Sequence, residues 1–184
     1  MSSVAGPAHP FEVVALGYRY PNPSWAKVLS DAVDSGPSGV VGRHMKAFVG
    51  EVTALSLGEW EELHTATLDL SAPFVPYVGH VIWGENYRRG EFMSELMVDM
   101  NRLGFDLGGE LPDHIEPLLR FMALTPDLSH IHKATELIEV VPGAVKTMLS
   151  SLTKADSKNP YRHLVAATVE VCADLQPLTI GVNR

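Results

Sequence analysis

The sequence predicts an all-α fold, in which one domain over residues 1–184 forms a bundle of roughly nine helices. Three observations predict this fold. Apolar residues recur at helical spacing along most of the chain, and no segment sustains the alternation typical of a strand. Turn residues divide the chain into segments of common helix length. Because the chain has 184 residues, of which 46% are hydrophobic, it can bury one sizeable core but not two.

The first half of the chain contains two well-marked helices. One is expected over about residues 39–54, with an apolar face made of Val41, His44, Met45, Phe48, Val52 and Leu55. Ser56 and Glu59 have the spacing of a capping box, in which each side chain bonds a free backbone N–H of the other residue. They predict a second helix that begins here and buries Leu57, Trp60, Leu63, Thr67 and Leu68.

The second half contains three further well-marked helices. One carries Phe92, Leu96, Met100 and Leu103 on its apolar face and ends at Gly104. Thr125-Pro126 has the order of a cap followed by proline, so a helix is expected to begin there. Its buried residues would be Leu128, Ile131, Leu137, Ile138 and Val141. The last helix has the most regular spacing, with Tyr161, Leu164, Val165, Thr168, Val169, Cys172 and Leu175 on one face.

Composition excludes several classes of protein. The net charge is −8, whereas a nucleic-acid partner requires a basic surface, so none is expected. A single cysteine, Cys172, excludes a disulfide framework and a multi-cysteine metal cage. No run of about 18 apolar residues is present, and no basic residue precedes Arg19 as a secretory signal requires. We therefore expect no membrane insertion and a cytoplasmic location.

Asp113-His114 is the clearest candidate for chemistry. A carboxylate next to an imidazole can transfer protons or bind a metal. The structural alternative is that Asp113 and Glu116 form the Asp-x-x-Glu start of a helix. No nucleotide-binding, serine-nucleophile or zinc-protease motif occurs in the sequence, so an enzyme is not indicated. An all-α metal-dependent hydrolase that uses Asp113 and His114 is the alternative function.

The segment from Pro73 to Gly90 is apolar and aromatic, and it ends in two arginines, Arg88 and Arg89. One interpretation is a central helix that is buried on nearly every side. The other is a groove that accepts an apolar peptide helix, with aromatic anchors inside and charges at the rim. Tyr77 and Trp83 are the better anchors, because each has a large apolar body and one polar atom.

Four segments in the middle of the chain form a further pattern when taken together. They are residues 77–90, residues 97–104 with their terminal glycine, Glu110-Leu-Pro-Asp-His-Ile115, and residues 121–124. Together they resemble the central region of NarJ-type proteins, the nitrate reductase delta subunits, which are relatives of TorD and DmsD. The resemblance implies an all-helical cytoplasmic chaperone that serves one molybdoenzyme. Such a chaperone binds the catalytic molybdopterin subunit, often at its N-terminal leader, and holds it open for insertion of the molybdenum cofactor before membrane attachment or twin-arginine export.

By the same resemblance, the segment implicated in leader binding is Leu111, Pro112, Asp113 and His114, and its neighbouring surface comprises Tyr77, His80, Trp83, Gly84, Arg88 and Arg89. Asp113 would pair with an arginine of the leader. The resemblance implies no stably bound cofactor, and a monomer or weak homodimer. A structural subunit that stays in a finished oxidoreductase complex is a further alternative.

Overall fold

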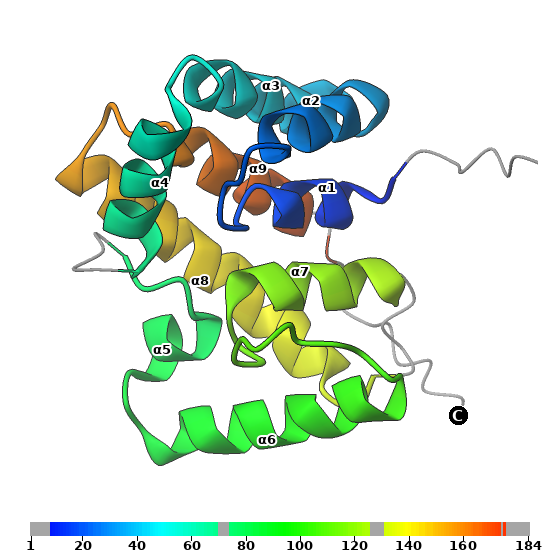
Figure 1. Ribbon diagram of the computed structural model, residues 1–184. Helices are drawn as coiled ribbons and strands as arrows, with labels where there is room; N and C mark the ends of the chain where they lie inside the picture. The colour runs from blue at the N-terminus through cyan, green and yellow to red at the C-terminus, as the bar shows by residue number, and fades with distance from the viewer. Residues whose placement is uncertain (1–7, 70–73, 126–130, 174, 176–184) are drawn as a thin grey trace, which may run out of the picture.

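The computed structural model describes residues 8–69, 74–125, 131–173 and 175. Within these ranges the backbone forms nine α-helices, one π-helical turn and no strand, which confirms the predicted all-α class (Figure 1). The helices are α1 (Pro10–Leu16), α2 (Trp25–Ser35), α3 (Gly39–Val52), α4 (Leu57–His64), α5 (Val78–Trp83), α6 (Tyr87–Arg102), α7 (Ile115–Leu124), α8 (Ala134–Ala155) and α9 (Tyr161–Ala173), with the π turn at Thr65–Asp69. A single domain over residues 1–184 stays a prediction.

The longest helix, α8, runs across the molecule and connects its two ends (Figure 1). The most extensive packing joins α3 to α9, α9 to α8, and α1 to α7. Helix α5 packs on both α8 and α6. In Figure 1, α7 lies between α1 and α6, while α2 and α3 lie at one end of the molecule and α5 and α6 lie at the other. The residues that resemble a leader-binding segment belong to this second end.

The core follows the predicted apolar faces in part. Met45, Phe48, Val52, Trp60 and Leu68 are buried, whereas Val41, His44, Leu55, Leu57 and Leu63 are half-buried. Tyr161 is fully buried in α9, and its hydroxyl accepts a hydrogen bond of 3.2 Å from the indole of Trp60 in α4. The ring of Phe48 in α3 packs edge-on against the Tyr161 ring, and the centres of the two rings are 5.0 Å apart. Aromatic pairs of this geometry add to the free energy gained from burial alone. The core thereby joins the last helix, α9, to α3 and α4, which lie about a hundred residues earlier in the chain.

The predicted helix ends at Ser56 and Gly104 are confirmed. Ser56 accepts a hydrogen bond from the Glu59 backbone N–H, and the Glu59 carboxylate accepts one from the Ser56 N–H, so the capping box is complete. Gly104 follows the last turn of α6 with φ of +63°, a conformation that only glycine adopts without strain. Leu103, by contrast, was expected in the core. It is 47% exposed, because it forms the C-cap of α6 instead of its apolar face.

Two further expectations about helices are wrong. Helix α8 begins at Ala134 and not at Thr125, whose hydroxyl instead bonds the Phe121 carbonyl and ends α7. Residues 126–130, including Leu128, lie outside the described residues. The expected helix buried on nearly every side is α5, which has six residues and leaves Ile82 41% exposed. Among the described helices, none is both long and apolar enough to cross a lipid bilayer.

Candidate functional site

A short backbone bridge holds together the two segments that carry the predicted site. Tyr77 pairs with His114 in an isolated antiparallel bridge. The Val78 N–H donates to the Asp113 carbonyl at 2.8 Å, and the Ile115 N–H donates to the Pro76 carbonyl at 2.9 Å. These bonds fix the start of α5 against the start of α7. Residues separated by more than thirty positions are thereby placed at one surface.

Asp113 is fully buried and forms an ion pair with Arg89 of α6. The guanidinium Nε donates to Oδ2 at 2.9 Å, and Nη2 donates to Oδ1 at 3.4 Å. Hydrogen bonding to this carboxylate raises the pKa of Arg89 above its ordinary value. The expected capping role of Asp113 is therefore wrong, because its carboxylate faces an arginine and not the first turn of α7.

His114 is the residue that caps α7. Its backbone is extended, and its Nδ1 accepts a hydrogen bond of 3.2 Å from the Glu116 N–H. The imidazole is 8% exposed and meets the Tyr77 ring edge-on at 5.0 Å. The sequence pattern did assign a cap to this region, but it placed the cap one residue too early.

Gly79 lets α5 approach this ion pair closely. A β-carbon at Gly79 would lie 2.7 Å from Asp113 Oδ2 and 3.0 Å from Arg89 Cγ. Arg89 also bonds Glu85 at 2.8 Å, and its guanidinium lies 5.4 Å from the centre of the Tyr77 ring. The charged pair is thus enclosed by α5, α6 and the segment that precedes α7.

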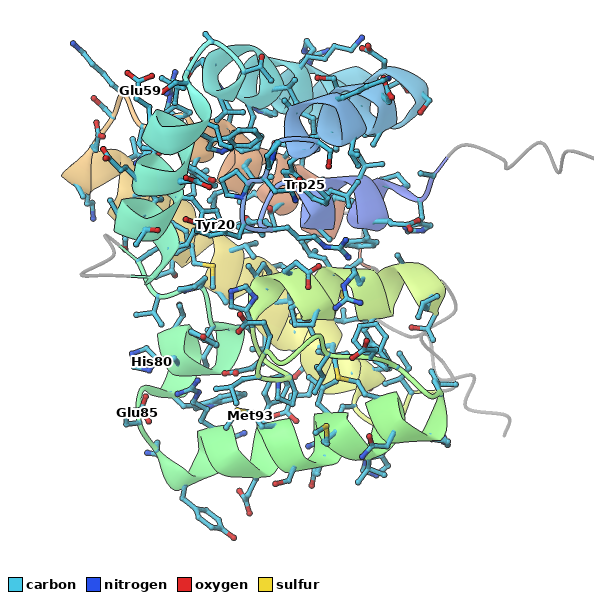
Figure 2. All side chains as sticks on the ribbon, viewed as in Figure 1. Tyr20, Trp25, Glu59, His80, Glu85 and Met93 are labelled. Atoms are coloured by element: carbon cyan, nitrogen blue, oxygen red, sulfur yellow. The ribbon has the colours of Figure 1, made fainter. Side chains whose placement is uncertain are left out.

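The surface that covers the buried ion pair, between α5, α6 and Leu111, is apolar with charges around it. Leu111 is 46% exposed, and the guanidinium of Arg88 lies over the half-buried Trp83 ring at 5.6 Å. Figure 2 shows His80 and Glu85 at the edge of the same corner, where Nδ1 of His80 and Oε1 of Glu85 are 2.9 Å apart. We call Tyr77, His80, Trp83, Gly84, Arg88 and Leu111 the α5–α6 corner, since these predicted residues are exposed or half-buried. The other four, Pro112, Asp113, His114 and Arg89, are buried beneath it.

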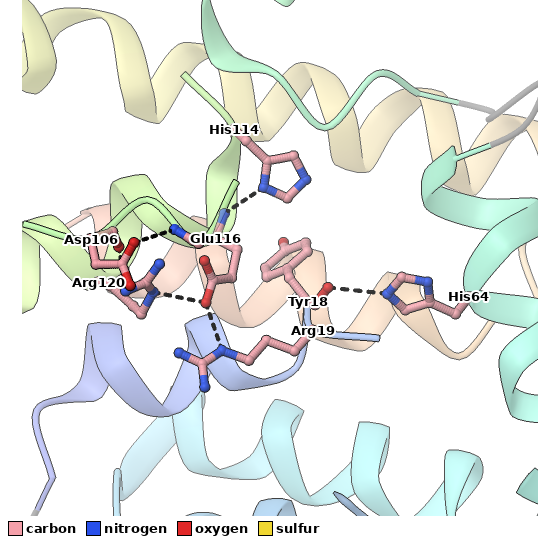
Figure 3. Close-up of polar contacts among 8 residues, drawn as sticks. Tyr18, Arg19, His64, Asp106, His114, Glu116 and Arg120 are labelled. Atoms are coloured by element: carbon pink, nitrogen blue, oxygen red, sulfur yellow. Dashed lines mark hydrogen bonds and ion pairs between the residues drawn. The ribbon is translucent and has the colours of Figure 1, made fainter. Parts of the chain in front are cut away.

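A cleft of about 400 Å³ lies on the other side of His114. At its wall, the Glu116 carboxylate accepts hydrogen bonds from Arg19 at 2.7 Å and from Arg120 at 2.8 Å (Figure 3). His64 Nε2 lies 3.1 Å from the Tyr18 carbonyl in the same view. Sequence reasoning missed this cleft, because its residues come from segments as distant as 19 and 116 and share no motif.

The described residues offer little support for metal chemistry. They contain no group of three or more histidine, cysteine, aspartate or glutamate side chains placed to hold a metal ion. Asp113 is ion-paired with Arg89, and His114 Nδ1 accepts a hydrogen bond from the Glu116 N–H in the first turn of α7. His132 is exposed before α8.

Comparison with known proteins gives a structural relative. No protein-family model matches this chain, and no curated protein sequence matches it. The crystal structure of a candidate redox enzyme maturation protein from Archaeoglobus fulgidus is similar, with a TM-score of 0.65 and 14% sequence identity. The similarity covers 94% of this chain and 98% of that one. This chain therefore has the fold of the Archaeoglobus fulgidus protein.

Proposed function

We propose that this chain is a chaperone that serves the maturation of one redox enzyme. It binds the catalytic molybdopterin subunit of an enzyme of the nitrate reductase or DMSO reductase type, at the N-terminal leader of that subunit. It does so in the cytoplasm and assists molybdenum cofactor insertion into the client, but it holds no cofactor stably itself. The release of the client precedes membrane attachment or twin-arginine export.

The observation that supports this proposal most is the gathering of two distant segments at one surface. Residues 77–89 and 111–114, singled out by their resemblance to NarJ-type proteins, meet through the backbone bridge between Tyr77 and His114. The fold, shared with a candidate redox enzyme maturation protein, agrees with the same role.

The chemistry of the corner suits a leader that has a cationic head and an apolar helix. The net charge of −8 attracts the head over about one Debye length, ~8 Å at physiological salt. Leu111 and the Trp83 ring then offer apolar area to the helix. Because the client must be released, we expect a dissociation constant of about 0.1–10 μM.

The test has two steps: capture of the client protein, and then measurement of the binding of its leader peptide. The tagged full-length chain is expected to retain a catalytic molybdopterin subunit that lacks its cofactor, identified by mass spectrometry. A synthetic peptide of that subunit's leader should then bind the purified chain in calorimetry. If the chain instead stays in the mature, active enzyme, it is a structural subunit and the proposal fails. Tight stoichiometric zinc or manganese binding would favour the hydrolase.

Two leucines at opposite ends of α7 give a matched pair of variants. Leu111 precedes the helix and lies in the corner, whereas Leu124 ends it; they are 46% and 65% exposed. Leu111→Asp should weaken peptide binding by about tenfold, about 1.4 kcal/mol. Leu124→Asp should leave it unchanged. Equal effects of the two variants would place the peptide elsewhere.

A further inference from the structure

Asp113 cannot contact a client in this conformation of the chain. It is 0% exposed, and both of its carboxylate oxygens already accept hydrogen bonds from Arg89. Arg89 is itself 8% exposed. A leader arginine would have to displace Arg89 and leave a buried guanidinium without its main partner, which is costly. The pair must therefore act through other residues.

The pair joins three segments that carry the α5–α6 corner. The Asp113 side chain bonds α6 through Arg89, while its backbone carbonyl bonds the first residue of α5 through the Val78 N–H. Two residues before Asp113 stands the exposed Leu111, and one residue before Arg89 stands Arg88, which covers Trp83. Any shift of the pair thus moves the apolar and cationic parts of the corner relative to each other.

We propose that Asp113 and Arg89 are positioning residues for client recognition, and that the exposed residues of the corner make the contacts. This inference rests on the proposed function. It assigns Asp113 a role different from the direct pairing with a leader arginine that its charge led us to expect. The buried pair sets the distance between Leu111 and the Trp83–Arg88 stack. A change in this distance lowers the affinity for every client peptide by the same factor.

The first experiment measures positioning without a client. Amide exchange of Val78 and Ile115, the two donors of the backbone bridge, is followed by NMR in Asp113→Asn, Arg89→Gln and the double variant. Asn keeps the volume of Asp, so the packing against Gly79 is retained. Each single variant should speed exchange of both amides about tenfold, and the double variant no further, since the residues act as one unit. Unchanged exchange would overturn the inference.

Asp99→Asn is the matched control for general destabilisation. Asp99 lies on the same helix as Arg89, is 1% exposed, and pairs with Arg102 at 3.1 Å and with the Lys133 N–H at 3.1 Å. Neither of these two partners belongs to the α5–α6 corner. Its replacement should leave the exchange of Val78 and Ile115 at the wild-type rate. Exchange accelerated equally by Asp99→Asn would show a general loss of stability and overturn the inference.

The second experiment separates positioning from direct contact. The probe is the synthetic leader peptide of the captured subunit, together with a version in which every arginine is replaced by glutamine. If Asp113 acts by positioning, Asp113→Asn weakens both peptides by the same factor. If Asp113 contacts a leader arginine, its effect disappears with the arginine-free peptide, which overturns the inference. If wild type binds neither peptide, the proposed function fails, and amide exchange alone decides whether the pair positions the corner.

Discussion

Gly79 provides a sharp test of the close approach between α5 and the buried ion pair. In most helical positions, replacing glycine by alanine stabilises a protein by about 0.5–1 kcal/mol, because alanine loses less backbone entropy on folding. At Gly79 the new methyl group would lie 2.7 Å from Asp113 Oδ2 and 3.0 Å from Arg89 Cγ. Overpacking of this kind costs about 1–3 kcal/mol. We expect Gly79→Ala to lower the free energy of unfolding by about 1–2 kcal/mol.

Urea denaturation followed by circular dichroism measures this change. For a chain of this length, 1 kcal/mol corresponds to about 2–4 °C in Tm, so thermal unfolding should show a drop of several degrees. Gly90→Ala in α6 and Gly143→Ala in α8 are the controls, since a β-carbon at either position meets nothing within 4 Å. Both should be neutral or stabilising. If Gly79→Ala matches them, the close approach does not constrain α5 and the reasoning is refuted.

Removal of the carboxylate should relieve part of this cost. In the Asp113→Ala background the nearest atom to the new methyl group is gone; Arg89 Cγ at 3.0 Å remains, with Phe92 Cδ1 at 3.5 Å in ordinary van der Waals contact. The effect of Gly79→Ala should therefore be smaller there than in wild type, by about 0.5 kcal/mol or more. A double-mutant cycle from four urea curves gives this coupling directly.

Two other measurements probe features away from the corner. Burial raises the pKa of the Cys172 thiol to about 12, so a thiol reagent at neutral pH should label the folded chain far more slowly than the urea-unfolded chain; equal rates would show that Cys172 is accessible. The bonds from Ser56 lower the pKa of Glu59, so the ionised carboxylate stabilises the folded state at pH above its unfolded pKa, about 4.3, and this contribution is lost as pH falls through the lower folded pKa. The stability difference between wild type and Glu59→Gln should therefore close in acid, and a difference that stays constant with pH would contradict the capping interaction.

Local patterns in the sequence predicted the helices well, because a helix depends on residues a few positions apart. The apolar face around Phe48 and the capping box at Ser56 are both read within one or two turns, and both are confirmed. Errors arose where a residue had two local options. Thr125-Pro126 fits a helix start, but Thr125 caps the end of α7, since its hydroxyl bonds a carbonyl one turn earlier, and the helix that buries Leu137 begins at Ala134.

The sequence predicted that the candidate residues lie near one another, but it did not predict the contacts among them. The resemblance gathered Tyr77, Arg89 and Asp113, and the structure brings these residues together. That Asp113 pairs with Arg89, 24 residues away, cannot be read from spacing, because many other cations in the chain were equally available. The cleft at Glu116 was missed for the same reason: Arg120 has the local i,i+4 spacing, but Arg19 lies 97 residues from Glu116.

Because the corner is exposed while the ion pair is buried beneath it, changes in peptide specificity need not disturb the fold. Leu111 and Arg88 stand at the surface, where substitutions cost little folding free energy, whereas Asp113 and Arg89 lie where they cost much. A library that randomises only exposed residues such as Leu111 and Arg88 should thus yield many folded variants with altered specificity for peptides. Under the proposed function, the specificity for peptides can therefore change through the exposed residues while the buried ion pair is kept.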